Sequence, residues 1–328
     1  MTPADAGDLA IESRGLTKVF GSQRAVDAVD LAVPRGSVFG FLGPNGSGKT
    51  TSLRMMLGLV SATSGDVRVL GERMPDRLRE VLPRVGALVE GPAFYPFLSG
   101  EANLRRFDSA DRHAPAATRR GRVASALDRV GLSAAASKKA GAYSLGMKQR
   151  LGIANALLQP RELLVLDEPT NGLDPQGTRE VRSLVRSFAA EGTTVFVSSH
   201  LLAEVEQICT HAAIMSAGAL VAQGSLAQLR GAGQSSVRVS TPDPGAAASV
   251  LAGFGLAPKT LDRADATADV SALLPVRDDP DAAIEIEIDD ILPALVRAGV
   301  RVRSFAVEEP SLEDRFVALT GEGFDVVR

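Results

Sequence analysis

A glycine-rich stretch carries the residue types that bind nucleotide phosphates. It fits the pattern Gly, four residues, Gly-Lys-Ser/Thr. Its members are Gly43, Pro44, Asn45, Gly46, Ser47, Gly48, Lys49 and Thr50. Glycines let the backbone turn tightly, so that its N–H groups can point at phosphate oxygens. We expect the Lys49 ammonium to reach the β- and γ-phosphates of a nucleoside triphosphate, and the Thr50 hydroxyl to bind Mg²⁺.

The segments that flank this stretch follow the order that phosphate binding requires. Residues 37–42 predict a short buried strand, and residues from Thr51 to Leu57 predict a helix whose N-terminus faces the anion. A chance glycine-rich turn with a lysine is the alternative, and average residue usage produces the pattern in roughly 1% of chains of this length. We therefore predict that residues 43–51 bind a nucleotide.

Two adjacent carboxylates follow a second buried strand. Residues 163–166 are all apolar, which is typical of a strand covered on both faces, and Asp167 and Glu168 come directly after them. Asp167 is placed to orient Mg²⁺, while Glu168 points to the opposite face and could orient and deprotonate the attacking water. An ordinary acidic turn is the alternative. The phosphate-binding stretch upstream favours the catalytic interpretation.

The composition is that of an ordinary globular chain. It has 328 residues, of which 45% are hydrophobic and 23% charged, and a net charge of −3. The length favours about two domains, and the charge gives no reason to expect nucleic acid as a partner. The single cysteine, Cys209, suits a reducing compartment. Because no segment has the pattern of a secretion signal or a membrane span, we expect a cytoplasmic protein that can dock on a membrane partner.

Hydrophobic patterns divide the chain into an α/β part and an appendage. Strand patterns fill residues 9–42, and helical periodicity extends over about 92–158. Apolar strands then alternate with helices, which predicts a mainly parallel sheet. We therefore expect a first domain over residues 1–232, with residues 92–158 as its helical subdomain.

Small polar residues at 231–236 indicate the boundary to a second domain. We expect a small α+β fold over residues 233–328, with a strand at 300–302. The apolar face of its last predicted helix consists of Leu312, Phe316 and Leu319. The acidic residues between 278 and 290 could hold a metal or a basic partner, but a solvated face is the favoured interpretation.

Taken with three further motifs, these features resemble the nucleotide-binding subunits of ABC transporters over about residues 8–230. The further motifs are Tyr-Ser-Leu-Gly-Met-Lys-Gln-Arg at 143–150, Asn-Gly-Leu-Asp at 171–174 and Ser-His at 199–200. All of them occur in the family's order at plausible spacing. The resemblance implies a phosphate-loop α/β fold of the ABC type, with an antiparallel β subdomain beside the parallel sheet and a helical subdomain.

The resemblance implies a role for each matching residue of the hydrolysis site. Lys49 and the loop amides hold phosphate. Thr50 binds Mg²⁺, and Asp167 supports that ion. Glu168 is the catalytic base, and His200 contacts the γ-phosphate and closes the site. The implied cofactors are ATP and Mg²⁺.

The resemblance also implies that each site is shared between two subunits. Ser144 and Gly146 match the signature element, which caps the ATP of the opposite subunit at a helix N-terminus. Asp174 belongs to a loop that communicates across the dimer. The chain carries one phosphate loop and one signature, so we expect a homodimer, or a pair of ATPase subunits, with two ATP molecules at the interface. Phe20, upstream of the phosphate loop, could stack on adenine, with a core phenylalanine as the alternative.

The chain departs from the family pattern at two places. Its signature has Leu145 and Met147 where the family usually has Gly and Gln, and it has Glu90 where most members carry a Gln near the metal and the water. A carboxylate at that position would tighten metal binding or slow the approach of hydroxide, unless residue 90 is only a structural loop residue. Both departures resemble the bacitracin-resistance type of drug-export ATPase. Residues 309–316 resemble the C-terminal extension of antibiotic-export ATPases, a group that includes the daunorubicin-resistance type.

The favoured interpretation is therefore the ATP-hydrolysing subunit of an ABC exporter. Its partner would be a separate integral membrane permease that holds it at the inner face of the membrane, and the helical segment 92–158 would pass motion to that permease. A soluble ABC ATPase that acts on ribosomes or nucleic acid is one alternative, and an importer subunit is another. The permease would choose the transported molecule.

Overall fold

The computed structural model describes residues 8–91, 93–111, 114–231, 235–262, 268–275 and 288–308. The described residues fall into two compact units, one reaching Leu226 and one beginning at Ala227. The predicted helix with Leu312, Phe316 and Leu319 lies outside the described residues, as do the stretch 309–316 and most of the acidic stretch.

The first unit is built around a six-stranded sheet in which all strands except β11 run parallel. In spatial order the strands are β11 (Ala219–Ser225), β10 (His211–Ser216), β4 (Val38–Leu42), β9 (Thr194–Ser199), β8 (Leu163–Asp167) and β7 (Val85–Leu88). Strands β4, β8 and β9 are buried along their whole length, as apolar central strands with both faces covered should be. The predicted mainly parallel α/β sheet is confirmed.

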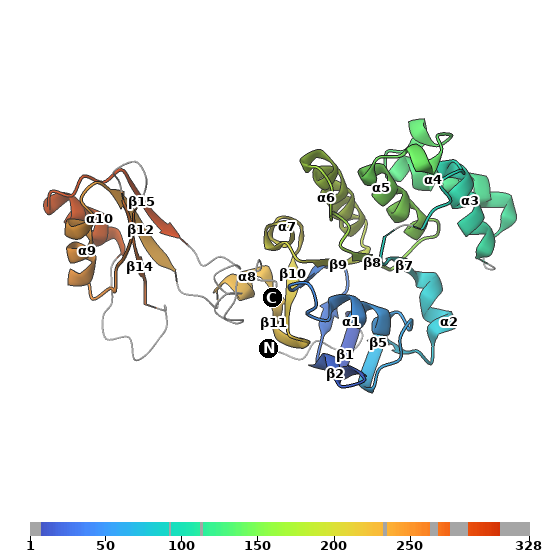
Figure 1. The fold of residues 1–328 in the computed structure, drawn as a ribbon, viewed down its shortest axis with the longest axis horizontal. Helices are drawn as coiled ribbons and strands as arrows, with labels where there is room; N and C mark the ends of the chain where they lie inside the picture. The colour runs from blue at the N-terminus through green and yellow to red at the C-terminus, as the bar shows by residue number, and fades with distance from the viewer. Residues whose placement is uncertain are drawn as a thin grey trace. The chain divides into compact units, whose positions relative to one another are not determined.

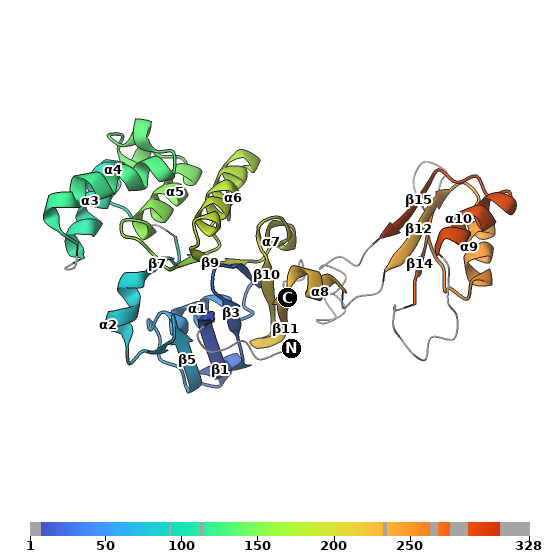
Figure 2. The ribbon, with the colours of Figure 1, turned by 180° about the vertical axis from the view of Figure 1, so that it is seen from behind.

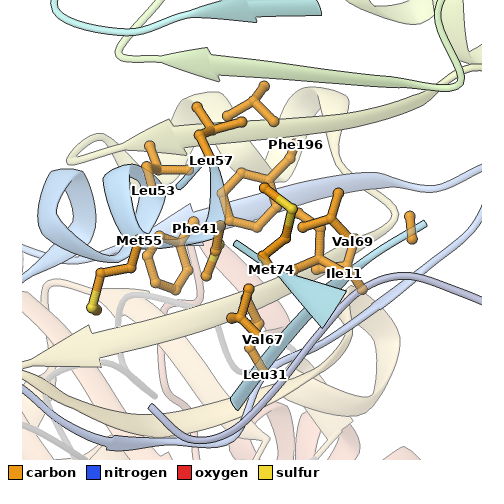
Figure 3. Packing of buried hydrophobic residues seen from close by; sticks show 14 of the residues in the cluster. Ile11, Leu31, Phe41, Leu53, Met55, Leu57, Val67, Val69, Met74 and Phe196 are labelled. Carbon is orange, nitrogen blue, oxygen red and sulfur yellow. The ribbon is translucent and has the colours of Figure 1, made fainter. Parts of the chain in front are cut away.

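A second sheet is antiparallel and shares a hydrophobic core with the parallel sheet and the helix α1 (Lys49–Met56). Its strands are β2 (Gln23–Val29), β1 (Leu9–Phe20), β3 (Ala32–Pro34), β5 (Ser64–Val69) and β6 (Glu72–Met74). Figure 2 labels β1, β3 and β5. Figure 3 shows how the shared core is assembled: Phe41 and Phe196 from the parallel sheet meet Leu53 of α1 and Val69 of β5. The middle and the end of α1 are thereby anchored in the core that the two sheets share.

Helices surround the parallel sheet in two groups. Helices α6 (Pro175–Ala190) and α7 (Leu202–Ile208) pack against its central strands. Helices α3 (Gly100–Ala110), α4 (Arg119–Arg129) and α5 (Leu145–Ala156) pack on one another, and α5 contacts β7 (green in Figure 1). The remaining helical turns of this unit are α2 (Leu78–Val81) and the short 3₁₀ helices Leu82–Arg84, Ala116–Thr118, Ser133–Ala135 and Ala140–Ala142. No helix among the described residues is long and apolar enough to cross a membrane.

A buried ion-pair cluster joins α3 to α4. The Asp108 carboxylate is fully buried, accepts hydrogen bonds from Arg122 Nε at 2.8 Å and Nη2 at 2.7 Å, and accepts another from Arg119 Nε at 2.9 Å. The hydrogen bonds from Arg122 lower the pKa of Asp108 from its usual value, against the opposing effect of burial, and Arg119 adds to the lowering. The two helices are therefore held together by a carboxylate that must stay ionised.

The boundary between the units lies in the first turn of α8 (Leu226–Gly231), and the second unit continues as an antiparallel sheet with two helices. The elements are β12 (Ser236–Thr241), α9 (Pro244–Gly253), β13 (Lys259–Asp262), β14 (Ala268–Leu273), α10 (Ile288–Arg297) and β15 (Ser304–Glu308). This is a β-α-β-β-α-β unit with the strand order β13-β14-β12-β15, typical of a split βαβ fold. The prediction of a strand at residues 300–302 is wrong. Gly299, with φ of +76°, ends α10 in a tight turn that buries Val300, and the strand starts at Ser304.

The Asp108 cluster yields a stability prediction. Asp108→Asn removes the anion that Arg119 and Arg122 share, and should lower the free energy of unfolding of the first unit by about 3 kcal/mol at pH 7. Because the folded-state pKa is lowered, this contribution is complete above the unfolded pKa and is lost as the pH falls through the folded pKa. Urea denaturation and hydrogen exchange of α3 and α4 would measure the loss. Asp128→Asn, at an exposed position of α4, is the matched control, and equal effects of the two changes would contradict the prediction.

Candidate active site

The phosphate loop connects the end of β4 to the start of α1. Gly48 precedes the helix with φ of +97°, and a Cβ atom there would lie 2.5 Å from the Ala25 carbonyl oxygen. A Cβ atom on Gly43 would lie 2.6 Å from the Met215 carbonyl oxygen. Both positions therefore require glycine, since other residues would push neighbouring backbone away.

Lys49 is buried within this loop. Its ammonium donates hydrogen bonds to the carbonyl oxygens of Gly43 at 2.6 Å and Pro44 at 3.1 Å, and lies 3.6 Å from Glu168 Oε1. Burial lowers the pKa of Lys49, while the neighbouring carboxylates of Glu168 and Asp167 oppose that lowering. The loop thus holds a cation next to the two acidic residues that the sequence predicts for catalysis.

Asp167 joins the loop to the neighbouring strand β9. Thr50 Oγ1 donates to Asp167 Oδ2 at 3.3 Å, and Ser198 Oγ donates to Oδ1 at 2.5 Å. Ser198 Oγ also accepts the backbone N–H of Glu168 at 3.0 Å. Ser198 is fully buried, and the sequence analysis did not identify it as a site residue. Its role becomes visible only in the pairing of β8 with β9, which places Ser198 opposite Asp167.

Glu168 and His200 form a close pair at the ends of β8 and β9. His200 Nδ1 lies 2.6 Å from Glu168 Oε2. Because an ionised carboxylate can only accept, His200 donates from Nδ1, which leaves Nε2 for another partner. Glu168 has φ of +48°, a left-handed conformation that costs a non-glycine residue about 1–3 kcal/mol. Such strain persists where the surroundings hold the residue firmly, which is common at active sites.

The residues present fit a magnesium nucleotide. No group of three or more metal-binding side chains occurs in the described part of the chain, but Thr50 and Asp167 offer two hard oxygen ligands side by side. This suits Mg²⁺, which usually takes one or two protein ligands and completes its shell with phosphate oxygens and water. Ser47 Oγ is buried in the loop without a hydrogen-bond partner in the described structure, as expected for a group that a phosphate would satisfy.

Glu90 lies in a different environment from Thr50 and Asp167. Its side chain is 55% exposed and forms an ion pair with Arg54 of α1. Its backbone has φ of +62°. A role of Glu90 at Mg²⁺ stays a prediction. The ion pair with Arg54 was not expected from the sequence motifs.

The signature residues lie in a separate surface hollow. Ser144 is the N-cap of α5 and accepts the Met147 N–H at 3.2 Å, while Asp174 is the N-cap of α6 and accepts the Gly177 N–H at 2.7 Å. Gly146 lines the same hollow. No described residue of the phosphate loop lines it. Within one chain, the structure thus unites Lys49, Thr50, Asp167, Glu168 and His200, and groups Ser144, Gly146 and Asp174 elsewhere.

Phe20 lies at the end of β1 and is 50% exposed, with Lys18 Nζ 4.9 Å from the centre of its ring. This exposure removes the alternative of a core phenylalanine. Stacking of Phe20 on adenine stays a prediction.

Comparison with known proteins agrees with this geometry. The family model for the ABC transporter matches residues 26–171. The bacitracin transport ATP-binding protein BcrA of Bacillus licheniformis is 45% identical over 212 residues, covering 64% of this chain and 68% of the relative. The daunorubicin/doxorubicin resistance ATP-binding protein DrrA of Streptomyces peucetius is 34% identical over 326 residues, covering 96% and 94%. This chain belongs to the ABC transporter family.

Solved structures support the same fold. The chain resembles cbiO1 from Clostridium perfringens, part of the ABC transporter complex cbiONQ, with a TM-score of 0.62 and 26% identity over 68% of this chain and 90% of that one. It also has the fold of the dimeric cassette MJ0796 bound to ADP and Pi, with a TM-score of 0.59, 24% identity, and coverage of 66% and 98%. The chain is thus the nucleotide-binding, ATP-hydrolysing subunit of an ABC transporter.

The unusual residue at position 90 yields a testable prediction. Glu90→Gln should raise the Mg²⁺ concentration for half-maximal ATP hydrolysis by up to about tenfold, since a unit charge about 6 Å from a divalent cation in water contributes about 1.4 kcal/mol. Titration of turnover with Mg²⁺ would measure this. Glu80→Gln, an exposed carboxylate paired with Arg77, is the control. An unchanged titration would leave residue 90 with a structural role through Arg54 alone.

Proposed function

We propose that this chain powers an exporter whose membrane-spanning half is a separate chain. Similarity to drug-resistance ATPases supports export, and one observation carries the pairing of two ATPase subunits. That observation is the division of the site into two surfaces, the phosphate loop with its acidic residues and the hollow at Ser144. Neither surface holds all the groups that the family uses around one ATP, so each site needs a second subunit.

Within one subunit we assign the hydrolysis roles as follows. Lys49 exchanges its contacts with the Gly43 and Pro44 carbonyls for the β- and γ-phosphates. Glu168 orients and deprotonates the attacking water. His200 holds that carboxylate by donating from Nδ1. With both ring nitrogens protonated, it would also donate from Nε2 to a γ-phosphate oxygen. Thr50 and Asp167 would hold Mg²⁺, which neutralises charge on the phosphates when bound.

The second half of each site would come from a partner subunit. Two copies pair head to tail, so that Ser144 and Gly146 at the N-terminus of α5 cap the ATP held by the opposite phosphate loop. Asp174, at the start of α6, lies in the same hollow as Ser144 and would connect the two sites. ATP binding closes this pair and hydrolysis reopens it.

Export of an antibiotic-like or lipid-like molecule is the proposed transport task. It is supported by the full-length similarity to a daunorubicin/doxorubicin resistance protein and by the similarity to a bacitracin transport protein. The helices α3, α4 and α5 would pass the motion of the ATPase pair to the permease, and that contact would hold this chain at the membrane.

The proposed base is tested by Glu168→Gln. The variant should bind ATP with near wild-type affinity, hydrolyse it at least about 100-fold more slowly, and accumulate as an ATP-bound dimer, because only the proton acceptor is lost. ATPase assays and gel filtration with ATP would measure these effects. Lys49→Ala is the control, and should lose both ATP binding and dimerisation. Turnover of Glu168→Gln near the wild-type rate would assign the base to another group.

The proposed partner is tested by gentle detergent extraction. The tagged full chain should co-purify with an integral membrane protein in a stable ratio, and vesicles containing both should transport in an ATP-dependent way. The Glu168→Gln variant in the same vesicles should bind the partner but not sustain transport. Recovery of ribosomal proteins or nucleic acid in place of a membrane protein would contradict the proposal.

A further inference from the structure

A carboxylate outside the phosphate loop is buried beside the proposed hydrolysis site. Glu204 lies in the first turn of α7 and is only 7% exposed. Glutamate is almost never this buried unless it is paired, because removal of its charge from water is costly. No motif identified in the sequence includes this residue.

Glu204 connects three segments of the first unit. Its Oε2 accepts a hydrogen bond from Thr170 Oγ1 and lies 3.4 Å from Ser199 Oγ, whose single hydrogen it shares with the Leu201 carbonyl oxygen, also at 3.4 Å. Its Oε1 lies 3.7 Å from Arg182 Nη2 of α6. We call Glu204 with these three partners the Glu204 bridge. A single carboxylate oxygen thus joins the loop after β8 to the last residue of β9.

The bridged segments carry the two proposed catalytic side chains. Thr170 follows Glu168 by two residues, and Ser199 directly precedes His200. Glu168 and His200 meet at 2.6 Å, so a small shift between their segments would break this contact. The left-handed conformation of Glu168 also needs neighbouring structure to maintain it. Asn171 N–H donates to the Glu168 carbonyl at 3.1 Å, which places Thr170 inside the turn that sets this conformation.

A contribution to folding stability does not by itself explain why a carboxylate is buried at position 204. Buried ion pairs are often no more stabilising than apolar side chains of similar size. What an apolar side chain could not do is accept hydrogen bonds from both segments at one atom. We propose that Glu204 is a positioning residue for ATP hydrolysis, which holds the Glu168 and His200 segments at the separation that their contact requires. The inference rests on the roles proposed above for Glu168 and His200.

The competing explanation is a purely structural one. Glu204 lies near the N-terminus of α7, where a negative charge is favourable, and its bridge could serve only to fix that helix. In that case its loss would lower the melting temperature, while folded molecules would turn over ATP at the wild-type rate. A positioning residue instead lowers kcat and leaves the KM for ATP unchanged, since the phosphate loop is not altered.

The test compares Glu204→Ala with Glu204→Gln in the full chain. Loss of the side chain should lower kcat about tenfold, because small misplacements of catalytic groups are costly, with KM and the affinity for a fluorescent ATP analogue within about twofold of wild type. Glutamine keeps an oxygen that accepts from Thr170 and Ser199, so kcat should remain within about threefold. Glu206→Gln, a half-buried carboxylate on the same helix, is the matched control. Melting temperatures are recorded for all variants.

Thr170→Val removes only the hydroxyl that the bridge uses. It should lower kcat by about threefold at an unchanged melting temperature, and combined with Glu204→Ala it should cost no more than Glu204→Ala alone, because both changes break one contact. If Glu204→Ala fails to fold, Thr170→Val decides the question, and a wild-type kcat then overturns the inference.

Three results would overturn the inference in a folded Glu204→Ala protein: a kcat within twofold of wild type, a loss confined to ATP binding, or an equal loss in Glu204→Gln. The Glu168→Gln variant separates this failure from that of the proposed function. Inactive Glu168→Gln with fully active Glu204→Ala would refute only the positioning role. Active Glu168→Gln would refute the proposed base itself.

Discussion

The parallel pairing of β9 between β4 and β8 is the constraint on which the site depends. In this register Leu42 lies opposite Ser199, and Asp167 lies opposite Ser198. Because the carboxyl ends of parallel strands meet at one edge, the phosphate loop, the acidic pair and the histidine reach the same place from three separate parts of the sequence. A shift of one residue in either pairing would turn these side chains to the other face of the sheet.

The phosphate loop adds a second constraint, which is steric. Gly43 and Gly48 approach backbone oxygens too closely to carry a side chain. The core shared by the two sheets and α1 anchors the chain that follows the loop, so that its shape is largely set by packing (Figure 3). Lys49 is consequently buried among carbonyl oxygens and carboxylates, where electrostatic interactions are stronger than in water.

The acidic pair is held by a network that extends away from the loop. Ser198 binds both the Asp167 carboxylate and the Glu168 N–H, and His200 binds the Glu168 carboxylate. The Glu204 bridge lies behind these residues and joins the same two strand ends. Ser198, Ser199 and His200, at and just after the end of β9, thus each contact either the acidic pair or Glu204. This explains how a strained Glu168 can be maintained in a segment that ends a strand.

The residue types and their spacing determined the mainly parallel sheet and the family, and they predict the residues of the nucleotide site, because loops that bind phosphate tolerate few residues at each position. The sequence analysis did not identify Ser198 or Glu204, nor did it predict that Arg54 pairs with Glu90. It also placed the last strand of the second unit at 300–302, directly after Gly299, where the turn that ends α10 delays the strand to Ser304. These features depend on which strands are neighbours and in what register, and on side chains that meet from segments far apart in the chain. A local sequence pattern does not specify contacts between distant segments, so only the tertiary structure decided these features.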